Sequence, residues 1–394
     1  MPRPARPNRL LLATAYVGFV SLGLPDTVLG VAWPSVRGTF GLDQSAVAVV
    51  LAGSSGAVLL SGLFAGRLLG AAGVGALLAG SSLLVALGTT GYALAPAWGL
   101  FAACSLLHGL GSGAIDSGLN YYAARHFSVR HMNWLHACWG LGATLGPLVM
   151  TGALVWSGDW RPGYGAVAAV LFGLTVLFVA TRGLWGGPGR ADEGVDAAPS
   201  VGVGEALRDP LVGLQVALFF VYTGVEATLG QWGFTVLTEA RGAGPEAAGA
   251  AVTAYWASIT VGRVALGAVA ERVGVDRLVR LSLVAAVVGV ALFALDVSYA
   301  ASAAGLVLTG LGFAVVFPSL MARTPARLGD ARAAHAVGFQ IGAATLGVAA
   351  LPGLSGVLAD RAGVGAVAAG ALGMAVTALL LHEAVLARGR RARA

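Results

Sequence analysis

Apolar runs, each about 20 residues long, recur from one end of this chain to the other, separated by short charged or Pro/Gly-rich breaks. Folded as an α-helix, a run of that length crosses the ~30 Å hydrocarbon core of a lipid bilayer. Hydrophobic residues make up 57% of the 394 positions and charged residues only 11%. The pattern excludes a soluble globule and predicts an all-α integral membrane protein.

The breaks between the runs predict twelve transmembrane helices. An even number of spans places both termini on the same side of the membrane. The first run is too long for a signal-peptide core and has no convincing small-residue cleavage site after it, so we expect it to be retained as a helix. The predicted spans are residues 9–32, 44–66, 74–95, 97–124, 132–156, 162–184, 211–238, 247–270, 279–297, 299–322, 333–358 and 363–386.

The basic residues predict the orientation. All 24 of them are arginines. On the side opposite the termini only Arg37, Arg161, Arg241 and Arg361 are expected, Arg263 lies inside a span, and the remainder lie on the side of the termini. Because Lys and Arg are enriched in cytoplasmic loops, both termini are predicted to be cytoplasmic in a multi-pass plasma-membrane protein. The net charge of +6 then reflects topology, and no nucleic-acid binding is expected.

A polar stretch divides the chain into two halves. Residues 185–210 are rich in Gly, Pro, Ala and acids, which is typical of a flexible or partly helical linker. It would join an N-terminal six-helix bundle, residues 1–184, to a C-terminal six-helix bundle, residues 211–394, that ends in a short basic tail. We place this linker in the cytoplasm.

The two halves resemble each other at an offset of about 200 residues. Asp26-x-x-x-Gly30 is matched by Glu226-x-x-x-Gly230, and the Gly-Leu-Gly of 109–111 by the Gly-Leu-Gly of 310–312. Duplicated halves of six helices, related by an axis along the membrane normal, form transporters whose site lies near the midplane between the halves. The sequence therefore predicts two pseudo-symmetric six-helix bundles.

Asp26, Asp116 and Glu226 are acids that lie well inside predicted membrane helices, away from the ends of the spans. A carboxylate in hydrocarbon costs a few kcal/mol or more, so such residues usually face a protein-lined aqueous path and bind or relay ions. We expect all three to be proton-coupling residues, with H⁺ or Na⁺ as the coupling ion. The alternative for Asp26 is a buried acid that only bonds to a neighbouring helix.

A polar stripe runs along the predicted helix 97–124. His108, Ser112, Asp116 and Asn120 follow one another at intervals of four residues, so they share one helical face. This stripe is expected to face away from lipid. We therefore predict that Asn120 binds solute beside Asp116.

A second group of polar and aromatic residues is suited to hydroxyl-bearing solutes. In the predicted helix 132–156, Asn133, His136 and Trp139 are spaced at i, i+3 and i+6. An indole can stack on the apolar face of a sugar while amide and imidazole groups bond its hydroxyls. The alternative for His136 is a bond to a neighbouring helix. The other predicted solute-binding residues are Gln231, Trp232 and Gln340.

A loop motif carries a family resemblance. The stretch Gly267-Ala-Val-Ala-Glu271-Arg272-Val-Gly-Val-Asp276 resembles the helix 8–9 loop motif of the major facilitator superfamily, and Gly62 to Arg67 resembles a degenerate copy of it. The resemblance covers the whole chain and implies the twelve-helix fold with two rocking bundles. It implies gating roles for Glu271, Arg272 and Arg67. It also implies a mainly structural role near the gate for Arg263.

Within that superfamily the chain most resembles the fucose permease subfamily. The carrying residues include Pro25-Asp26-Thr27, the Asp116-to-Asn120 stretch, the Asn133-to-Trp139 stretch and the Glu226-to-Trp232 stretch. The resemblance implies proton or sodium symport of fucose, galactose or glucose, with Asp26 at the proton site of helix 1. The subfamily usually has Glu where this chain has Asp116, so this carboxyl reaches one methylene less far.

Several function classes are disfavoured. The chain lacks a Gly-Lys-Ser/Thr phosphate loop, a His-Glu-x-x-His motif and a Cys-x-x-Cys motif, so we expect neither an enzyme nor a bound cofactor or metal. The leading hypothesis is a monomeric proton symporter for a small polar solute, with the lipid bilayer as its other partner. An alternative is a proton antiporter that exports drugs or metabolites, suggested by the partial antiporter motif at 142–147. A third is a non-transporting membrane sensor or scaffold.

Overall fold

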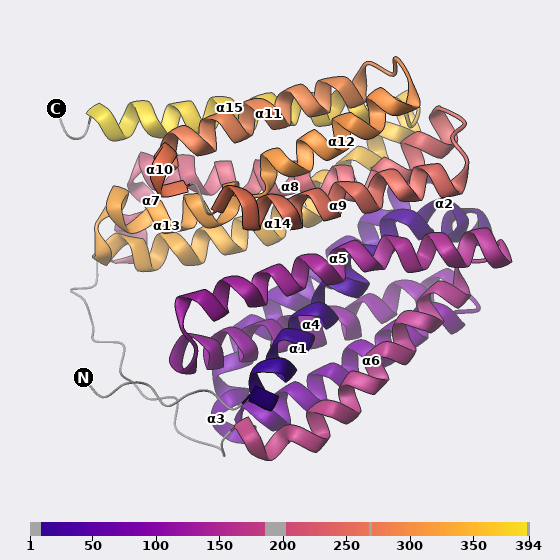
Figure 1. Ribbon diagram of the computed structural model, residues 1–394, viewed down its shortest axis with the longest axis horizontal. Coiled ribbons are helices and arrows are strands. Elements are labelled where there is room, and N and C mark those ends of the chain that lie inside the picture. Colours follow the sequence, from indigo (N-terminus) through magenta and orange to yellow (C-terminus); the bar gives the residue numbers. More distant parts are fainter. Residues whose placement is uncertain (1–8, 186–201, 268–269, 392–394) are drawn as a thin grey trace. The chain divides into compact units, whose positions relative to one another are not determined.

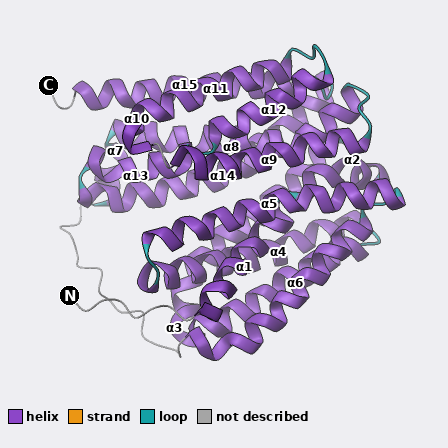
Figure 2. Ribbon diagram, in the orientation of Figure 1, coloured by secondary structure: helices purple, strands orange, loops and turns teal. Residues whose placement is uncertain are grey.

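The computed structural model describes residues 9–185, 202–267 and 270–391, and every regular element within these ranges is a helix (Figures 1 and 2). The chain divides into two compact units. Unit 1 comprises residues 1–42 and 49–194, and unit 2 comprises residues 43–48 and 195–394. The boundary between the units at 194/195 lies inside the segment that the sequence identifies as the linker, most of which is outside the described residues.

The helices of unit 1 follow the predicted spans to within a few residues, apart from one join. A short 3₁₀ turn, Arg182–Trp185, extends the last of them. They are α1 Arg9–Asp26, α2 Val28–Phe40, α3 Val47–Leu94, α4 Trp98–His126, α5 Val129–Ser157 and α6 Arg161–Thr181.

Unit 2 contains the remaining helices. A π-helical turn, Val236–Ala240, continues α8, and the first residues of unit 2 include a 3₁₀ turn, Gln44–Ala46. The helices are α7 Val203–Arg208, α8 Pro210–Thr235, α9 Pro245–Gly267, α10 Ala270–Val273, α11 Val275–Ala294, α12 Tyr299–Phe313, α13 Val316–Leu328, α14 Asp330–Ala362 and α15 Ala366–Arg391.

Ten helices in the described ranges are long and apolar enough to cross a membrane. The difference from the twelve predicted spans has two causes. Residues 44–94 count as one helix although the bend at Gly73 divides them into two segments, as predicted, and α9 has the length of a span but a lower mean hydropathy. In addition, α1 with α2, and α12 with α13, are each single spans with a local interruption. The all-α membrane fold is confirmed.

The predicted break between residues 66 and 74 is confirmed as a bend at one residue, Gly73, and not as a loop. The helix continues past Arg67 and is interrupted only at Gly73, whose backbone has φ 75° and ψ 164°. Side chains with a Cβ rarely adopt that conformation, so glycine is the residue that can bend the chain here without strain. The apolar residues 68–72 keep the preceding segment helical up to the bend.

The Gly-Leu-Gly repeat of the sequence performs a packing role in unit 1. A Cβ at Gly109 would collide with the carbonyl of Ser54, and one at Gly111 would lie 2.6 Å from the carbonyl of Ser81. The two glycines therefore let α4 approach both halves of α3 at backbone distance. Such contacts between small residues replace the hydrophobic driving force that is absent between helices in lipid.

The same device recurs in unit 2. A Cβ at Gly310 would collide with the side chain of Ser258 on α9, and one at Gly312 would lie 2.6 Å from the carbonyl of Ser282 on α11. Helix α12 is thus held between α9 and α11 just as α4 is held between the halves of α3. The internal repeat read from the sequence corresponds to a repeated packing arrangement.

Helices α1 and α5 cross at very close range. A Cβ at Gly23 would collide with the carbonyl of Trp139, and a Cβ at Gly142 would collide with the carbonyl of Val20. In unit 2 the corresponding pair is α8 and α14, where a Cβ at Gly347 would collide with the carbonyl of Phe220. The position of α1 against α5 is therefore fixed by glycine.

Residues 43–48 are held to the rest of unit 2 by Asp360, which caps the 3₁₀ turn Gln44–Ala46. The carboxylate of Asp360 on α14 accepts hydrogen bonds from the backbone N–H of Gln44 at 2.7 Å and of Ser45 at 2.9 Å. The Gln44 amide donates to Glu239 at 2.8 Å. A carboxylate that accepts from free N–H groups at a helix start acts as a cap, here supplied by a residue distant in sequence.

A buried amide network joins three helices of unit 2. The Nε2 atom of Gln340 on α14 donates to Oε1 of Gln215 on α8 at 3.2 Å, and the hydroxyl of Thr324 on α13 lies 3.1 Å from Oε1 of Gln340. Gln340 and Thr324 have no exposed surface and Gln215 is 1% exposed. The expectation that Gln340 lines a solute cavity is wrong in this structure, because its amide is covered and bonded within the unit.

Gly142→Leu is expected to destabilise unit 1 strongly. The added side chain overpacks the α1–α5 crossing, which costs ~3 kcal/mol or more because backbone atoms have to move apart. The measurement is the thermal unfolding midpoint of the purified protein in detergent. Gly152→Leu, on the same helix with open space around its Cα, is the matched control and should leave the midpoint nearly unchanged. Equal midpoints for the two variants would contradict the packing described here.

Gln340→Leu is expected to lower the unfolding free energy by ~1–3 kcal/mol, because Gln215 and Thr324 lose a buried hydrogen-bonding partner. The same thermal measurement checks it. Thr345→Val, also on α14, is the control: its hydroxyl is exposed and bonds only to Ile341 of its own helix. A loss no larger than that of the control would show that the network contributes little.

Candidate functional site

Asp26 lies where the first membrane span is interrupted. Helix α1 ends at Asp26, Thr27 forms a turn, and α2 begins at Val28. Pro25 contributes to the interruption because it has no backbone N–H to donate. The Thr27 hydroxyl donates to the carbonyl of Ala143 on α5 at 2.9 Å, which ties the break to the neighbouring helix.

The Asp26 carboxylate is exposed although the residues on both sides of it are buried. Its side chain is 37% exposed. The Trp139 indole donates a hydrogen bond to it, and Nε2 of His108 lies 3.9 Å from its Oδ1. The negative charge of Asp116 repels it. Three helices of unit 1, α1, α4 and α5, thus bring an acid, a histidine, an indole and a second acid together. The proton-coupling roles of Asp26 and Asp116 and the solute-binding role of Trp139 stay predictions.

Asn120 positions the second acid of unit 1. Its Nδ2 donates to Oδ1 of Asp116 at 2.9 Å and to the Asp116 carbonyl at 3.0 Å. Asp116 is exposed and Asn120 is half-buried, whereas His108 and Ser112 of the same polar stripe on α4 are buried. On α5, His136 is exposed and its ring packs edge-on against Phe19 at 5.3 Å. The side chain of Asn133 lies outside the described residues.

The acid of unit 2 has a different environment. The Tyr222 hydroxyl donates to Oε2 of Glu226 at 3.1 Å, and the Tyr255 hydroxyl donates to the Glu226 carbonyl at 2.9 Å. The guanidinium of Arg263 on α9 attracts the Glu226 carboxylate. Glu226 is therefore a half-buried acid held between two phenols and a permanent cation.

The structure adds partners for Arg263, whose charge acts on Glu226 and on the Tyr222 and Tyr255 hydroxyls. The mainly structural role near the gate that the resemblance implies for Arg263 stays a prediction. Arg272 is exposed, and the side chain of Glu271 lies outside the described residues. The gating roles predicted for Arg272 and Glu271 stay predictions.

The other predicted gating residue, Arg67, is exposed on α3, with its guanidinium 5.8 Å from the centre of the Phe64 ring. An ion-pair cluster that the analysis did not single out lies instead near the loop motif of unit 2. Asp276 accepts from Arg323 at 3.0 Å and from Arg327 at 2.8 Å. Asp276 belongs to the motif, so its place in the motif was the available signal, whereas its arginine partners lie on α13.

Two other predicted solute ligands occupy different environments. Trp232 is 1% exposed and its indole donates to the Pro352 carbonyl at 2.9 Å, so the expectation that it contacts solute is wrong in this structure. Gln231, one residue earlier, is 7% exposed, and its Nε2 has no hydrogen-bond partner among the described residues. Of the two, Gln231 keeps a free donor.

Three site residues were missed or left unassigned by the sequence analysis. His108 was recognised as a member of the α4 stripe without a role, and its spacing from Asp116 was the signal. Tyr222 precedes Glu226 by one helical turn, a spacing that places both on one face. Tyr255 lies on α9 and was not predicted, because its contact with Glu226 on α8 depends on helix packing.

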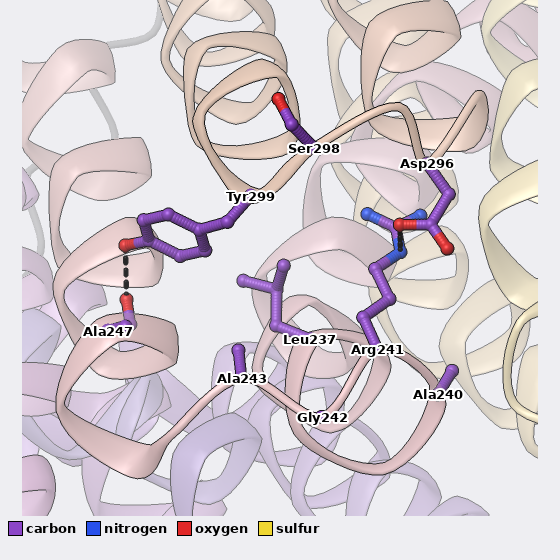
Figure 3. Close-up of a pocket in the computed structure, with 9 residues that line it drawn as sticks. All are labelled: Leu237, Ala240, Arg241, Gly242, Ala243, Ala247, Asp296, Ser298 and Tyr299. Carbon is purple, nitrogen blue, oxygen red and sulfur yellow. Dashed lines mark hydrogen bonds and ion pairs between the residues drawn. The ribbon is translucent and has the colours of Figure 1, made fainter.

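A cavity of about 580 Å³ lies at one end of unit 2, among residues of the α8–α9 and α11–α12 connections (Figure 3). Arg241 pairs there with Asp296 at 2.9 Å and donates to Ser302 at 2.7 Å. The Tyr299 hydroxyl donates to the Ala247 carbonyl. Burial lowers the pKa of the Arg241 guanidinium and Asp296 opposes this. Because these polar groups are bonded within the protein, their role is to hold the α8–α9 and α11–α12 connections together.

Comparison with known proteins identifies relatives along almost the whole chain. The model of the Major Facilitator Superfamily matches residues 15–237 and 216–393. An uncharacterized transporter, y4wD of Sinorhizobium fredii (strain NBRC 101917 / NGR234), is 29% identical over 340 residues, which are 84% of this chain and 86% of that protein. Bypass of stop codon protein 6 of Saccharomyces cerevisiae (strain ATCC 204508 / S288c) is 28% identical over 193 residues, 43% of this chain and 38% of that protein.

Solved structures share the fold at low sequence identity. The nucleoside transporter NupG superposes with a TM-score of 0.71 at 16% identity, covering 96% of this chain and 98% of that one. A bacterial homolog of the human lysosomal transporter Spinster, in an inward-facing and occupied conformation, gives a TM-score of 0.77 at 11% identity and covers 97% of each chain. At such identities these structures show the fold alone. From the match of its whole length to the family model, the chain belongs to the Major Facilitator Superfamily and is a multi-pass membrane transporter.

Proposed function

We propose that this transporter carries a small hydroxyl-rich solute, a sugar or a sugar-like molecule, by proton symport with alternating access. The observation that carries the proposal is the position of Asp26. Its carboxylate is exposed at a break in a membrane helix, hydrogen-bonded by Trp139 and close to Asp116. The other parts of the proposal follow from the chemistry around it.

A charged side chain inside the bilayer is energetically costly. An exposed carboxylate in a membrane span is tolerated where protein-lined water surrounds it, and such groups mark ion pathways. Binding one proton to Asp26 removes its charge and its repulsion by Asp116. A carrier with a neutral site reorients more easily than one with a charged site, because a charge is not then moved through a low-dielectric region. Proton binding would in this way permit the transport step.

The chemistry of the surrounding side chains favours a solute with hydroxyl groups. Unit 1 offers the exposed imidazole of His136, the indole of Trp139 and the amide of Asn120. These groups can stack on a ring and bond hydroxyls. Fucose, galactose and glucose are the first candidates from the subfamily resemblance. NupG is a nucleoside transporter, and nucleosides contain a pentose, so they belong in the same screen.

The remaining elements of the proposal are carried over from the sequence. We propose that the protein acts as a monomer in the plasma membrane. Both termini are placed in the cytoplasm, because most arginines lie on the side of the termini. Sodium is the alternative coupling ion, since a carboxylate with nearby carbonyl oxygens also suits Na⁺. Export by antiport is the alternative direction. Its support in the 142–147 stretch is weakened because Gly142 and Gly146 serve the close packing of α1 on α5.

Asp26→Asn is expected to abolish proton-driven accumulation. The test is uptake of labelled fucose, galactose, glucose or uridine into proteoliposomes with an acidic exterior. An amide resembles the protonated acid but cannot exchange its proton, so accumulation should fall at least about tenfold, equivalent to ~1.4 kcal/mol, while solute counterflow continues. Asp116→Asn should reduce accumulation as well. Uptake that depends on a Na⁺ gradient instead of a pH gradient would show that Na⁺ is the coupling ion. Uptake that requires an acidic interior would indicate antiport.

Asp43→Asn is the matched control. Asp43 is an exposed acid outside the helices with no side-chain cap interaction. The substitution removes the same charge and should leave accumulation unchanged. If Asp26→Asn and Asp116→Asn both accumulate solute like the unaltered protein, with the same pH dependence, the proton-coupling proposal is wrong. Counterflow separates loss of coupling from loss of solute binding.

A further inference from the structure

His108 is a buried titratable residue beside Asp26. Its side chain is 8% exposed, and its Nε2 atom has no hydrogen-bond partner among the described residues. That atom lies 3.9 Å from Oδ1 of Asp26, too far for a hydrogen bond and near enough for an ion pair. Leaving a buried polar nitrogen without a partner is unfavourable, so packing alone does not account for its position.

The groups around His108 come from three helices. Ser54 on α3 lies with its Oγ 3.5 Å from Nδ1 of His108, and the Tyr92 ring of α3 lies 6.2 Å from the imidazole. Asp26 faces it from α1. On α4 itself, Asp116 follows two helical turns later. Among the described residues, Asp26 is therefore the charged group within ion-pair distance of the imidazole, and it would stabilise a positive charge there.

Comparison of the two units shows why the pairing matters. Glu226 of unit 2 has the guanidinium of Arg263 as a counter-charge, and a guanidinium keeps its proton at any physiological pH. Among the described residues, the basic group within ion-pair distance of Asp26 is His108, whose charge depends on a bound proton. The acid of unit 2 thus lies in the field of a permanent cation, whereas the basic group beside the acid of unit 1 is charged only when a proton is bound.

We infer that His108 and Asp26 form one proton-binding pair, in which His108 is a positioning residue that shares the coupling proton. This inference rests on the proton-coupled function proposed above. With one proton bound, the pair is neutral, either as carboxylate with imidazolium or as carboxylic acid with imidazole. With none bound, it carries a single negative charge. The pair therefore converts one proton into a change from a charged to a neutral site.

The proton transfer balances without any other reagent. The N–H bond at Nε2 breaks as the O–H bond at Oδ1 forms, and the electron pair of that N–H bond stays on nitrogen. Transfer requires a separation of about 2.6–3.2 Å or one bridging water. The Asp26 carboxylate lies at the junction of α1 and α2, so a shift of about 1 Å at the junction brings the two atoms within that reach.

A double-mutant cycle in proton binding tests the pair. The purified protein, without any solute, is titrated between about pH 8 and pH 5, the range in which imidazole changes charge. The four proteins are the unaltered chain, His108→Gln, Asp26→Asn and the double variant. In the unaltered background, His108→Gln should shift the uptake of the site's proton to lower pH, because Asp26 then binds the proton without a partner. In the Asp26→Asn background it should change almost nothing, because a buried cation without its carboxylate is unfavourable.

The control is a histidine substitution whose effect on proton binding should not depend on Asp26. His126→Gln, at the exposed end of the same helix, should have the same effect in both backgrounds. If His108→Gln also has the same effect in both, the two groups titrate independently and the pair is wrong. Variants are compared only where their thermal midpoints match the unaltered protein, and His108→Asn replaces His108→Gln if that one fails to fold.

The two proposals can fail separately. An additive cycle, together with loss of proton-driven accumulation in Asp26→Asn, would reject the pair and retain proton coupling. A non-additive cycle in a carrier whose uptake ignores pH would reject proton coupling as the function, and with it the transport role of the pair. In a proton symporter with the pair, His108→Gln should also change the pH profile of uptake of the labelled solute, while counterflow at low pH continues.

Discussion

The close approach of helix backbones at glycine is the constraint on which the site depends. Hydrocarbon provides no hydrophobic drive to bring helices together, so their contacts depend on packing and hydrogen bonds. Where α1 crosses α5, Gly23 and Gly142 remove the Cβ atoms that would hold the two backbones apart. That crossing places the Trp139 indole on the Asp26 carboxylate. A bulkier residue at position 23 or 142 would push α1 and α5 apart and so separate the Asp26 carboxylate from the Trp139 indole, without changing any charge.

The acids inside the spans of the two units lie in different electrostatic environments. In unit 2, Glu226 is held by the Tyr222 hydroxyl and attracted by Arg263, so its charge is balanced inside the unit. In unit 1, Asp26 remains exposed, with an indole donor and an imidazole whose charge depends on a proton. Duplication of the helices has thus preserved the packing while the electrostatics of the two halves differ. This difference directs the coupling proposal to unit 1.

Much of the fold could be predicted from the sequence, and the errors have identifiable causes. Helix positions were predicted to within a few residues, because the apolar runs and their breaks are strong signals. The continuation of α3 through Arg67 to Gly73 was not predicted, since one exposed arginine resembles a loop in sequence. In the site, Asp26, Asp116 and Trp139 lie near one another, and the roles predicted for them stay predictions. Gln340 and Trp232 were expected to contact solute but are covered and bonded within unit 2.

The sequence by itself determined that this is a duplicated, all-helical membrane protein with acids inside its spans, because hydropathy, the internal repeat and charge are local properties of the chain. The tertiary structure decided which neighbour covers each helical face. Helical periodicity places Gln340 on one face of α14, but only the packing of α8 and α13 shows that this face is closed. Likewise, the partners of Asp26 and Glu226 lie on other helices, and contacts between residues distant in sequence depend on packing that the local pattern does not contain.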